Sequence, residues 1–96
     1  MPADNVPART WTFLSNHGHV LILLSQDADA RLRDIAAAVG VTERAATAII
    51  NDLEAAGYLT RSREGRRNHY TVHKHQLFRH QLEAGHSIDE LLRIFR

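Results

Sequence analysis

The sequence predicts a small, mainly α-helical domain with one β-hairpin, a fold of the α+β class. Two runs of apolar residues at helical spacing meet at a tight turn through Gly40, and two short extended segments follow around Gly65. A capping sequence at Ser87 then opens a last helix. With 96 residues, the chain has the length of one domain with one core. We therefore expect a three-helix core, a hairpin and a C-terminal helix.

The N-terminal part of the chain changes from an irregular to a helical pattern. Residues 1–9 contain both prolines and no periodicity, so we expect a flexible arm. Trp11 and Phe13 alternate with threonines, a pattern that fits either a short extended segment or a first helical turn. After the capping residue Ser15, apolar residues at helical spacing predict a first helix over about residues 16–25.

A tight turn joins the next two predicted helices. Residues 30–32 are expected to form a very short strand, and a short second helix then ends at Gly40 in the left-handed conformation. Thr42 is a good N-cap for a third helix over residues 43–56. The buried stripe of this helix follows the spacing i, i+3, i+4, i+7 and consists of Ala46, Ile49, Ile50 and Leu53.

The C-terminal half begins with a hairpin and ends with a helix. Strands are predicted over residues 58–63 and 68–72, joined by a loop in which Gly65 supplies a positive φ. The stretch 73–85 fits a helical turn or a packed loop equally well. The sequence S-I-D-E at residues 87–90 is a capping box for a last amphipathic helix.

Positive charge is concentrated in the predicted hairpin. The whole chain has a formal net charge of +1, yet residues 61–79 hold six basic residues and one acid, a local charge of +5. A basic stripe on a near-neutral body is typical of nucleic-acid-binding surfaces. A merely solvated charged face is the alternative, but these charges cluster at a hairpin rather than along a helix.

The third predicted helix has an outer face suited to reading bases. Since its apolar stripe points inward, the residues that point outward are Arg44, Thr47, Ala48 and Asn51. Arg44 can bind guanine O6 and N7, and Asn51 can pair with adenine. Thr47 and Ala48 can contact a thymine methyl group. The helix carries one basic residue against three acids, so we expect the hairpin to supply most of the affinity.

Other polar residues are placed to contact the DNA backbone. Arg33, near the start of the second helix, and Thr42 can hold phosphates. Arginines of the hairpin can reach phosphates or a narrow minor groove. The backbone and minor-groove candidates in the hairpin are Arg61, Arg63, Arg66, Arg67, Asn68 and His69.

The order of these elements resembles a known family. The segments V-G-V-T-E-R-A, L-E-A-A-G-Y-L-T-R and E-G-R-R-N-H-Y are similar to those of winged helix-turn-helix transcription regulators of the MarR/ArsR-like group, in particular small stand-alone prokaryotic ones. The resemblance covers about residues 11–72. It implies dimeric binding to double-stranded DNA, with the helix from Glu43 in the major groove and residues 58–72 as the wing.

The resemblance also suggests how the chain is organised. We expect an arm at 1–9, a DNA-binding domain at 10–73 and a dimerisation extension at 74–96. Two-fold pairing would place two recognition helices about 34 Å apart, one turn of B-DNA. By analogy we expect a homodimeric repressor with an unknown effector. The apolar residues expected in the dimer interface are Trp11, Phe13, Ile88, Leu91, Leu92, Ile94 and Phe95.

Several classes of function lack sequence support. There is no nucleophile motif, paired-carboxylate spacing or glycine-rich phosphate loop, so we expect no enzyme activity and no cofactor. Cysteine is absent, and the longest apolar run, residues 20–24, is too short to span a bilayer. We expect a cytoplasmic protein that associates with the nucleoid when bound to DNA and has no membrane partner.

Two alternatives stay open on the sequence alone. A winged helix can act as a protein-interaction or dimerisation module without binding DNA, and the acidic balance of the third helix is compatible with that. A regulator that responds to zinc or nickel is the second alternative, although we expect no metal site. Its candidate ligands are His73, His75, His80 and His86.

Overall fold

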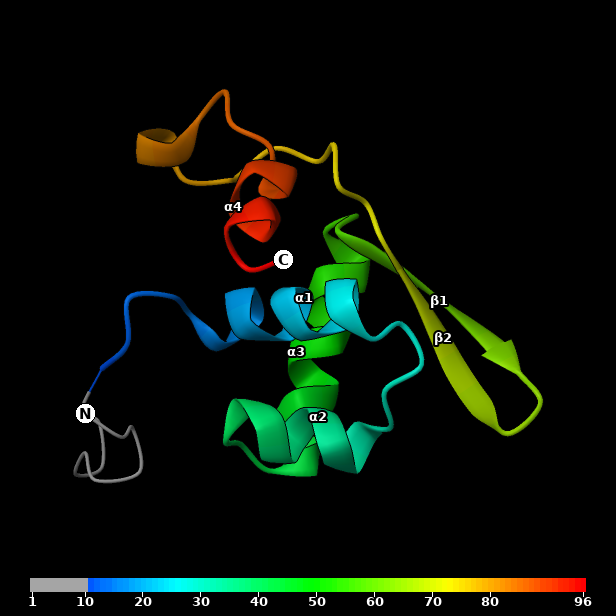
Figure 1. The fold of residues 1–96 in the computed structure, drawn as a ribbon. Helices are drawn as coiled ribbons and strands as arrows, with labels where there is room; N and C mark the ends of the chain where they lie inside the picture. The colour runs from blue at the N-terminus through cyan, green and yellow to red at the C-terminus, as the bar shows by residue number, and fades with distance from the viewer. Residues whose placement is uncertain (1–10) are drawn as a thin grey trace.

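The computed structural model describes residues 11–96, and the predicted arm at 1–9 lies outside this range. Three helices cross one another, a hairpin extends from the end of the third, and a short fourth helix lies against the first (Figure 1). The predicted α+β class and the three-helix core are confirmed. In chain order the elements are α1 (Asn16–Gln26), α2 (Leu32–Val39), α3 (Glu43–Ala55), β1 (Leu59–Glu64), β2 (Arg67–Val72), the 3₁₀ helix η2 (Gln81–Glu83) and α4 (Ile88–Ile94).

The predicted caps fix the helix ends. Ser15 Oγ accepts a hydrogen bond from the Gly18 amide at 3.2 Å, which satisfies one free donor at the start of α1. Thr42 Oγ1 accepts from the Ala45 amide at 3.0 Å and does the same for α3. Gly40 ends α2 with φ +87°, a conformation that a residue with a Cβ adopts only at a cost. These features define where α1 and α3 begin and where α2 ends.

The core lies between the first three helices, the base of the hairpin and α4. The predicted stripe of α3 is buried, with exposed fractions between 0 and 8%. It packs with apolar side chains of α1 and α2 and with two residues of the wing, Leu59 and Tyr70. Burial of this stripe anchors α3 from behind, and its opposite face is left in solvent.

The hairpin is antiparallel and tightly connected. Leu59 pairs with Val72, and Glu64 pairs with Arg67, so only two residues form the turn. Gly65 has φ +66° at the first turn position, where type II′ turns need a positive φ. β1 is displaced by one residue from its predicted bounds, and β2 begins one residue earlier than predicted and ends as predicted.

The very short strand predicted at residues 30–32 is wrong. The carbonyl of Arg31 accepts hydrogen bonds from the amides of Asp34 and Ile35, each at 2.9 Å, and so begins α2. A single backbone hydrogen bond connects this region to the hairpin, from the Tyr70 amide to the Ala28 carbonyl at 2.8 Å. The loop before α2 therefore lies beside β2 without becoming a strand.

The C-terminal segment covers one side of the core. Residues 73–85 form turns and η2, and Leu77 and Ser87 make an isolated bridge. The capping box of α4 is present, with Glu90 Oε2 accepting from the Ser87 amide at 2.9 Å. Ile88 and Leu92 are each 2% exposed in the chain's own core. These two residues therefore do not offer the dimer surface predicted for them, because α4 folds back and buries them against the core.

Candidate nucleic-acid interface

The outer face of α3 is open to solvent, as the sequence predicted. Arg44, Ala48 and Asn51 are exposed, and Thr47 is half-buried. The Thr47 hydroxyl donates to the Glu43 carbonyl of its own helix at 2.9 Å, so its hydrogen is already used. Thr47 is thus suited to apolar contact through its methyl group rather than to donating to a base.

Two arginines of the helix-turn-helix have no side-chain partner within the described residues. Arg44 at the start of α3 and Arg33 in α2 are exposed, and within residues 11–96 neither makes a side-chain hydrogen bond or ion pair. A free guanidinium keeps all five donors for a phosphate or a guanine edge. Thr42 is exposed too, with its hydroxyl oxygen accepting from Ala45 and its hydroxyl hydrogen available.

Arg61 of the wing is bonded to α3. It lies on the hairpin face that turns toward α3, and its Nη2 donates to Asn51 Oδ1 at 3.2 Å and to Glu54 Oε1 at 3.0 Å. Its side chain is only 30% exposed. Arg61 was predicted to reach phosphates, but its ion pair with Glu54 turns Nη2 of its guanidinium toward α3.

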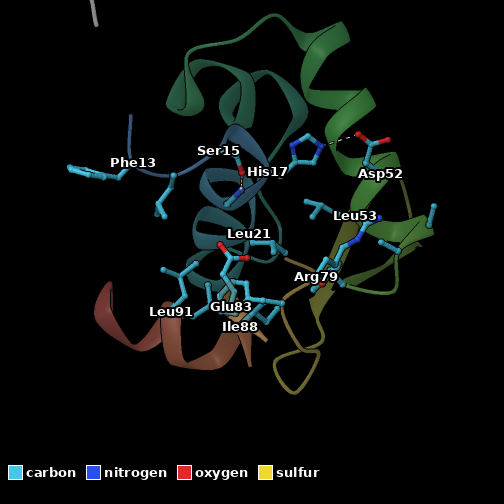
Figure 2. Close-up of a pocket in the computed structure, with 17 residues that line it drawn as sticks. Phe13, Ser15, His17, Leu21, Asp52, Leu53, Arg79, Glu83, Ile88 and Leu91 are labelled. Carbon is cyan, nitrogen blue, oxygen red and sulfur yellow. Dashed lines mark hydrogen bonds and ion pairs between the residues drawn. The ribbon is translucent and has the colours of Figure 1, made fainter. Parts of the chain in front are cut away.

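The neighbouring acid of α3 is also paired. Asp52 Oδ2 lies 2.9 Å from His17 Nε2 on α1 (Figure 2). Together with the Glu54–Arg61 pair, this contact directs two of the three acids on α3 toward other elements of the protein. The acidic balance seen in the sequence therefore does not describe the outer face of the helix.

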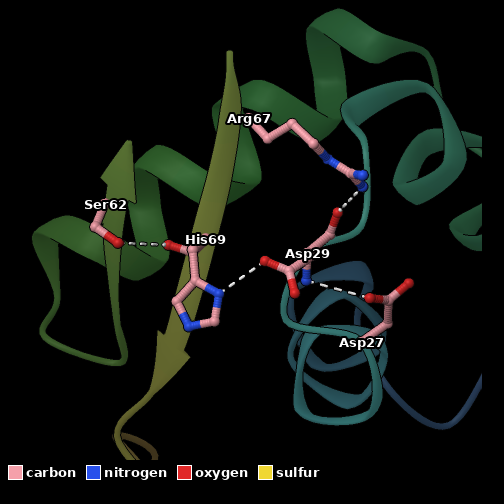
Figure 3. A network of polar contacts seen from close by, with 5 residues as sticks. All are labelled: Asp27, Asp29, Ser62, Arg67 and His69. Carbon is pink, nitrogen blue, oxygen red and sulfur yellow. Dashed lines mark hydrogen bonds and ion pairs between the residues drawn. The ribbon is translucent and has the colours of Figure 1, made fainter. Parts of the chain in front are cut away.

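The wing is held against the loop between α1 and α2 by a group of contacts that we call the Asp29 clamp (Figure 3). Arg67 Nη2 donates to the Asp29 carbonyl at 2.6 Å, and His69 Nδ1 lies 2.8 Å from Asp29 Oδ1. The hydrogen bond that the His69 ring donates to the Asp29 carboxylate raises the pKa of His69. Burial opposes this shift, while the charges of Asp29 and Glu64 act in the same direction as the hydrogen bond. Arg67 and His69 were predicted to contact DNA, but both are engaged in positioning the wing.

The remaining wing candidates lie near the hairpin turn. Arg66 is exposed and makes no side-chain hydrogen bond or ion pair with any described residue. Arg63 is exposed as well, and its Nε donates to the nearby Gly65 carbonyl at 3.3 Å. Asn68 is half-buried and bonds weakly to Tyr70 at 3.5 Å. The turn thus presents Arg63 and Arg66 as the cations with free donors.

An open groove of about 690 Å³ lies away from this face, between α1, the end of α3 and the C-terminal segment (Figure 2). Its lining is mostly apolar, with Arg79 and Glu83 as charged groups at the C-terminal side. No local pattern in the sequence indicated this groove, because its walls come from four separate segments. Phe13 lies at its rim and is 93% exposed.

Within the described residues, the histidines proposed for the metal-responsive alternative do not form a cluster that could bind one metal ion. His73 contacts Thr60 at 2.7 Å, His80 accepts from Leu82, and His86 contacts Glu90 at 2.9 Å. Among the described residues, the single group of three close ligand-type atoms lies elsewhere, at Asp29, Glu64 and His69. His69 Nδ1 there is already bonded to Asp29, and Arg67 brings a positive charge to the same loop. These atoms serve the Asp29 clamp.

No helix in the described part of the chain combines the length and the apolar character that a membrane crossing needs. A comparison with curated proteins found no match. Among solved structures, the chain is similar to MepR, a transcription regulator of the Staphylococcus aureus multidrug efflux pump MepA, with a TM-score of 0.53 and 26% sequence identity. That similarity covers 60% of this chain and 45% of MepR, so it spans less than half of MepR's length.

The family comparison agrees with the geometry. The model of the MarR family matches residues 15–66, from the N-cap of α1 to the turn of the hairpin. This range is more than half of the chain, and it holds the helix-turn-helix, the candidate base-reading face and the first strand of the wing. The chain therefore belongs to the MarR family, and its fold is the winged helix-turn-helix.

Proposed function

We propose that this protein is a transcription regulator that binds double-stranded DNA in a sequence-specific manner. The observation that carries the proposal is the orientation of α3. Its apolar stripe is buried, its opposite face exposes Arg44 and Asn51 and leaves Thr47 half-buried, and the wing stands beside it. An α-helix of this kind fits the major groove, and the wing then reaches the backbone or the adjacent minor groove. Such a role places the protein in the cytoplasm, at the nucleoid.

The arginines with free side-chain donors are the expected contacts to the DNA backbone. Arg33 on α2, together with Arg63 and Arg66 near the hairpin turn, has free donors for phosphates. Thr42 adds a hydroxyl at the start of the helix. If three phosphates are neutralised per subunit, the slope of log K against log salt is about −3, since each contact contributes roughly −0.9.

We also propose that the regulator is a homodimer and acts as a repressor. Trp11, Phe13 and Ile94 are 68, 93 and 71% exposed, and Phe95 and part of Leu91 are accessible beside them. Burying such side chains against a second copy is favourable, and two-fold symmetry then presents two copies of α3 to successive major grooves. Blocking a promoter requires only this DNA-binding surface, which favours repression.

The protein-interaction alternative loses its main support. It rested on the acids of α3, and two of them are paired within the protein with His17 and Arg61.

The test is selection of bound duplexes from a random pool at low salt, with the full chain. We expect a palindromic consensus whose two halves are centred about one helical turn, 10 base pairs, apart. Recovery of a single unpaired half-site would contradict the dimer. Binding that does not distinguish the selected pool from the starting pool would contradict sequence-specific recognition.

A further inference from the structure

Three side chains of the types that bind metal ions meet where the wing faces the loop between α1 and α2. Glu64 pairs with Arg67 across the hairpin, and His69 follows Arg67 by two residues, so Glu64 and His69 lie on the same face of the wing. Asp29 comes from the loop and contacts His69 there (Figure 3). One oxygen of each carboxylate and one ring nitrogen of His69 all lie within 4.8 Å of one another.

The position of Glu64 is not explained by the contacts of the wing. Its exposed side chain makes no hydrogen bond or ion pair within residues 11–96. Arg63 and Arg67, which lie close to it in sequence, bond to backbone carbonyls instead. The Asp29 clamp therefore holds the wing without Glu64. Two carboxylates this close repel each other, and a cation bound between them removes the repulsion.

The three donor atoms suit a transition-metal ion. One imidazole nitrogen with two carboxylate oxygens is a set that Zn²⁺ and its first-row neighbours accept, whereas Mg²⁺ and Ca²⁺ take oxygen ligands. Bonds from Zn²⁺ to such ligands are about 2.0–2.2 Å long, so the three atoms must draw closer together. Exposed side chains can do this by rotation, and the fourth position of a tetrahedral site is then left for water.

We propose that Asp29, Glu64 and His69 bind a divalent transition-metal ion such as Zn²⁺, and that the ion secures the wing to the loop before α2. The ion replaces the hydrogen bond between His69 and Asp29 with bonds from both residues to one centre. None of the four histidines considered from the sequence alone takes part. The inference concerns metal binding by the wing and does not rest on DNA binding.

Arg67 is compatible with this site. Its Nη2 donates to the backbone carbonyl of Asp29 at 2.6 Å, so the contact leaves the Asp29 carboxylate available to a metal ion. Two carboxylates against one guanidinium still leave a net negative charge around the three donor atoms. The same arginine fixes the loop that carries Asp29 beside β2, which brings ligands from two parts of the chain together before the ion arrives.

The test uses the full chain, freed of metal by a chelator, with Zn²⁺ alone as the probe. Competition with a zinc-binding dye measures the affinity and the stoichiometry, and an NMR titration of the histidine rings locates the ion. We expect one Zn²⁺ per chain, with the signals of the His69 ring changing before those of the other histidines. Mg²⁺ at the same concentration should change none of them, because it prefers oxygen ligands.

Glu64→Gln is the decisive variant, because it removes a candidate ligand and leaves the hydrogen bond between Asp29 and His69 in place. We expect Glu64→Gln and His69→Gln each to weaken zinc binding by about tenfold or more, since even residues that only orient a ligand have effects of this size. His75→Gln is the matched control. His75 is exposed, lies outside the wing and makes no side-chain hydrogen bond with any described residue, so this variant should bind zinc as tightly as wild type.

Hydrogen exchange at the Tyr70 amide tests whether the ion secures the wing. This amide donates to the Ala28 carbonyl at 2.8 Å, directly before Asp29 in the chain. An ion that binds only the attached wing stabilises that state, so Zn²⁺ should slow exchange of the Tyr70 amide in wild type and in His75→Gln. In Glu64→Gln the same concentration of Zn²⁺ should have little effect.

Several results would overturn the metal site. They are the absence of zinc binding in wild type, changes at other histidine rings before His69, and the same changes with Mg²⁺. Undiminished zinc binding in Glu64→Gln, or an equal loss in His75→Gln, would overturn it as well. Zinc bound at His69 without slower exchange of the Tyr70 amide would overturn the role of the ion in securing the wing. All of these measurements are made without DNA, so failure of the proposed function is detected separately, by the selection of duplexes.

Discussion

Two parts of the candidate interface, α3 and the wing, are held in place by different forces. Ile50 and its neighbours on α3 are buried among aliphatic side chains and nearly excluded from water. The outer part of the wing is held instead by polar contacts at the surface, those of Arg67 and His69 with Asp29 and that of Arg61 with Glu54. Apolar burial contributes several kcal/mol and is insensitive to salt, whereas exposed ion pairs contribute about 0–1 kcal/mol and are screened.

The comparison indicates a division of tasks. The helix that we propose reads bases, α3, should keep its position under all conditions in which the protein is folded. Displacing the wing costs little free energy, so pH, salt or a bound partner can change how the wing contacts the DNA backbone. The following predictions test this difference, beginning with the largest expected effect.

Ile50→Ala should destabilise the whole domain. Ile50 is 1% exposed at the centre of the α3 stripe, and removing three carbon atoms leaves a cavity that the core cannot fill. We expect the free energy of unfolding to fall by about 2–5 kcal/mol, a large part of the stability of a domain this small. Urea denaturation measures the change. The control is Arg44→Ala on the outer face, where we expect a change within about 0.5 kcal/mol. Similar losses in both variants would remove the distinction between the two faces.

Arg44→Ala should affect recognition rather than stability. Its free guanidinium can bind guanine O6 and N7 through two hydrogen bonds, a contact worth about 1–3 kcal/mol of discrimination. We expect this variant to lose the preference at one base pair of each half-site and to keep the others. Kd values on a duplex series with single substitutions measure this. Uniform weakening on all duplexes would show instead that Arg44 contacts phosphate.

The local pattern of the sequence predicted the elements and their faces well. Ser15, Thr42 and Gly40 act within one helical turn, so their roles follow from neighbouring residues alone. The buried stripe of α3 follows from its 3.6-residue period. What the pattern does not contain is the partner of a long polar side chain. Asp29 and His69 are 40 residues apart, and nothing in either segment indicates that the fold brings them together.

The terminal helix illustrates the same limit for apolar residues. Ile88 and Leu92 share a helical face with Leu91 close beside it, and periodicity alone identifies this face as one to be buried. Whether a chain buries such a face against its own core or against a second copy depends on tertiary geometry. Here the hydrogen bond from Gln26 Nε2 to the Phe95 carbonyl, at 2.7 Å, ties α4 to α1 and keeps the face inside the chain.

Arg66→Ala and Arg67→Ala should differ in the salt dependence of DNA binding. Arg66 is uncommitted, so removing it should reduce the slope of log K against log salt by about 0.9, the value for one phosphate contact. Arg67 is bonded to the Asp29 carbonyl, and its removal should change the slope by less. Fluorescence anisotropy from low to moderate salt measures both slopes. A larger change for Arg67→Ala than for Arg66→Ala would contradict the assignment of Arg67 to the clamp.

The smallest expected effect is a dependence of the wing on pH, which α3 should not share. The hydrogen bond to the Asp29 carboxylate raises the pKa of His69 above its ordinary value, so the charged pair stabilises the folded wing at acidic pH. This contribution is complete below the ordinary histidine pKa and is lost as pH rises through the raised pKa. The charges of Asp29 and Glu64 favour the charged form as well, while burial opposes it. An NMR titration of the His69 ring should show the raised pKa, and Asp29→Asn should return it toward the ordinary value.

Protection of the Tyr70 amide from hydrogen exchange, corrected for the intrinsic exchange rate, should fall as pH rises, while protection of the Ile50 amide stays constant. Equal pH dependence at both amides would mean that the wing and α3 open together, and that the clamp is not a separate support.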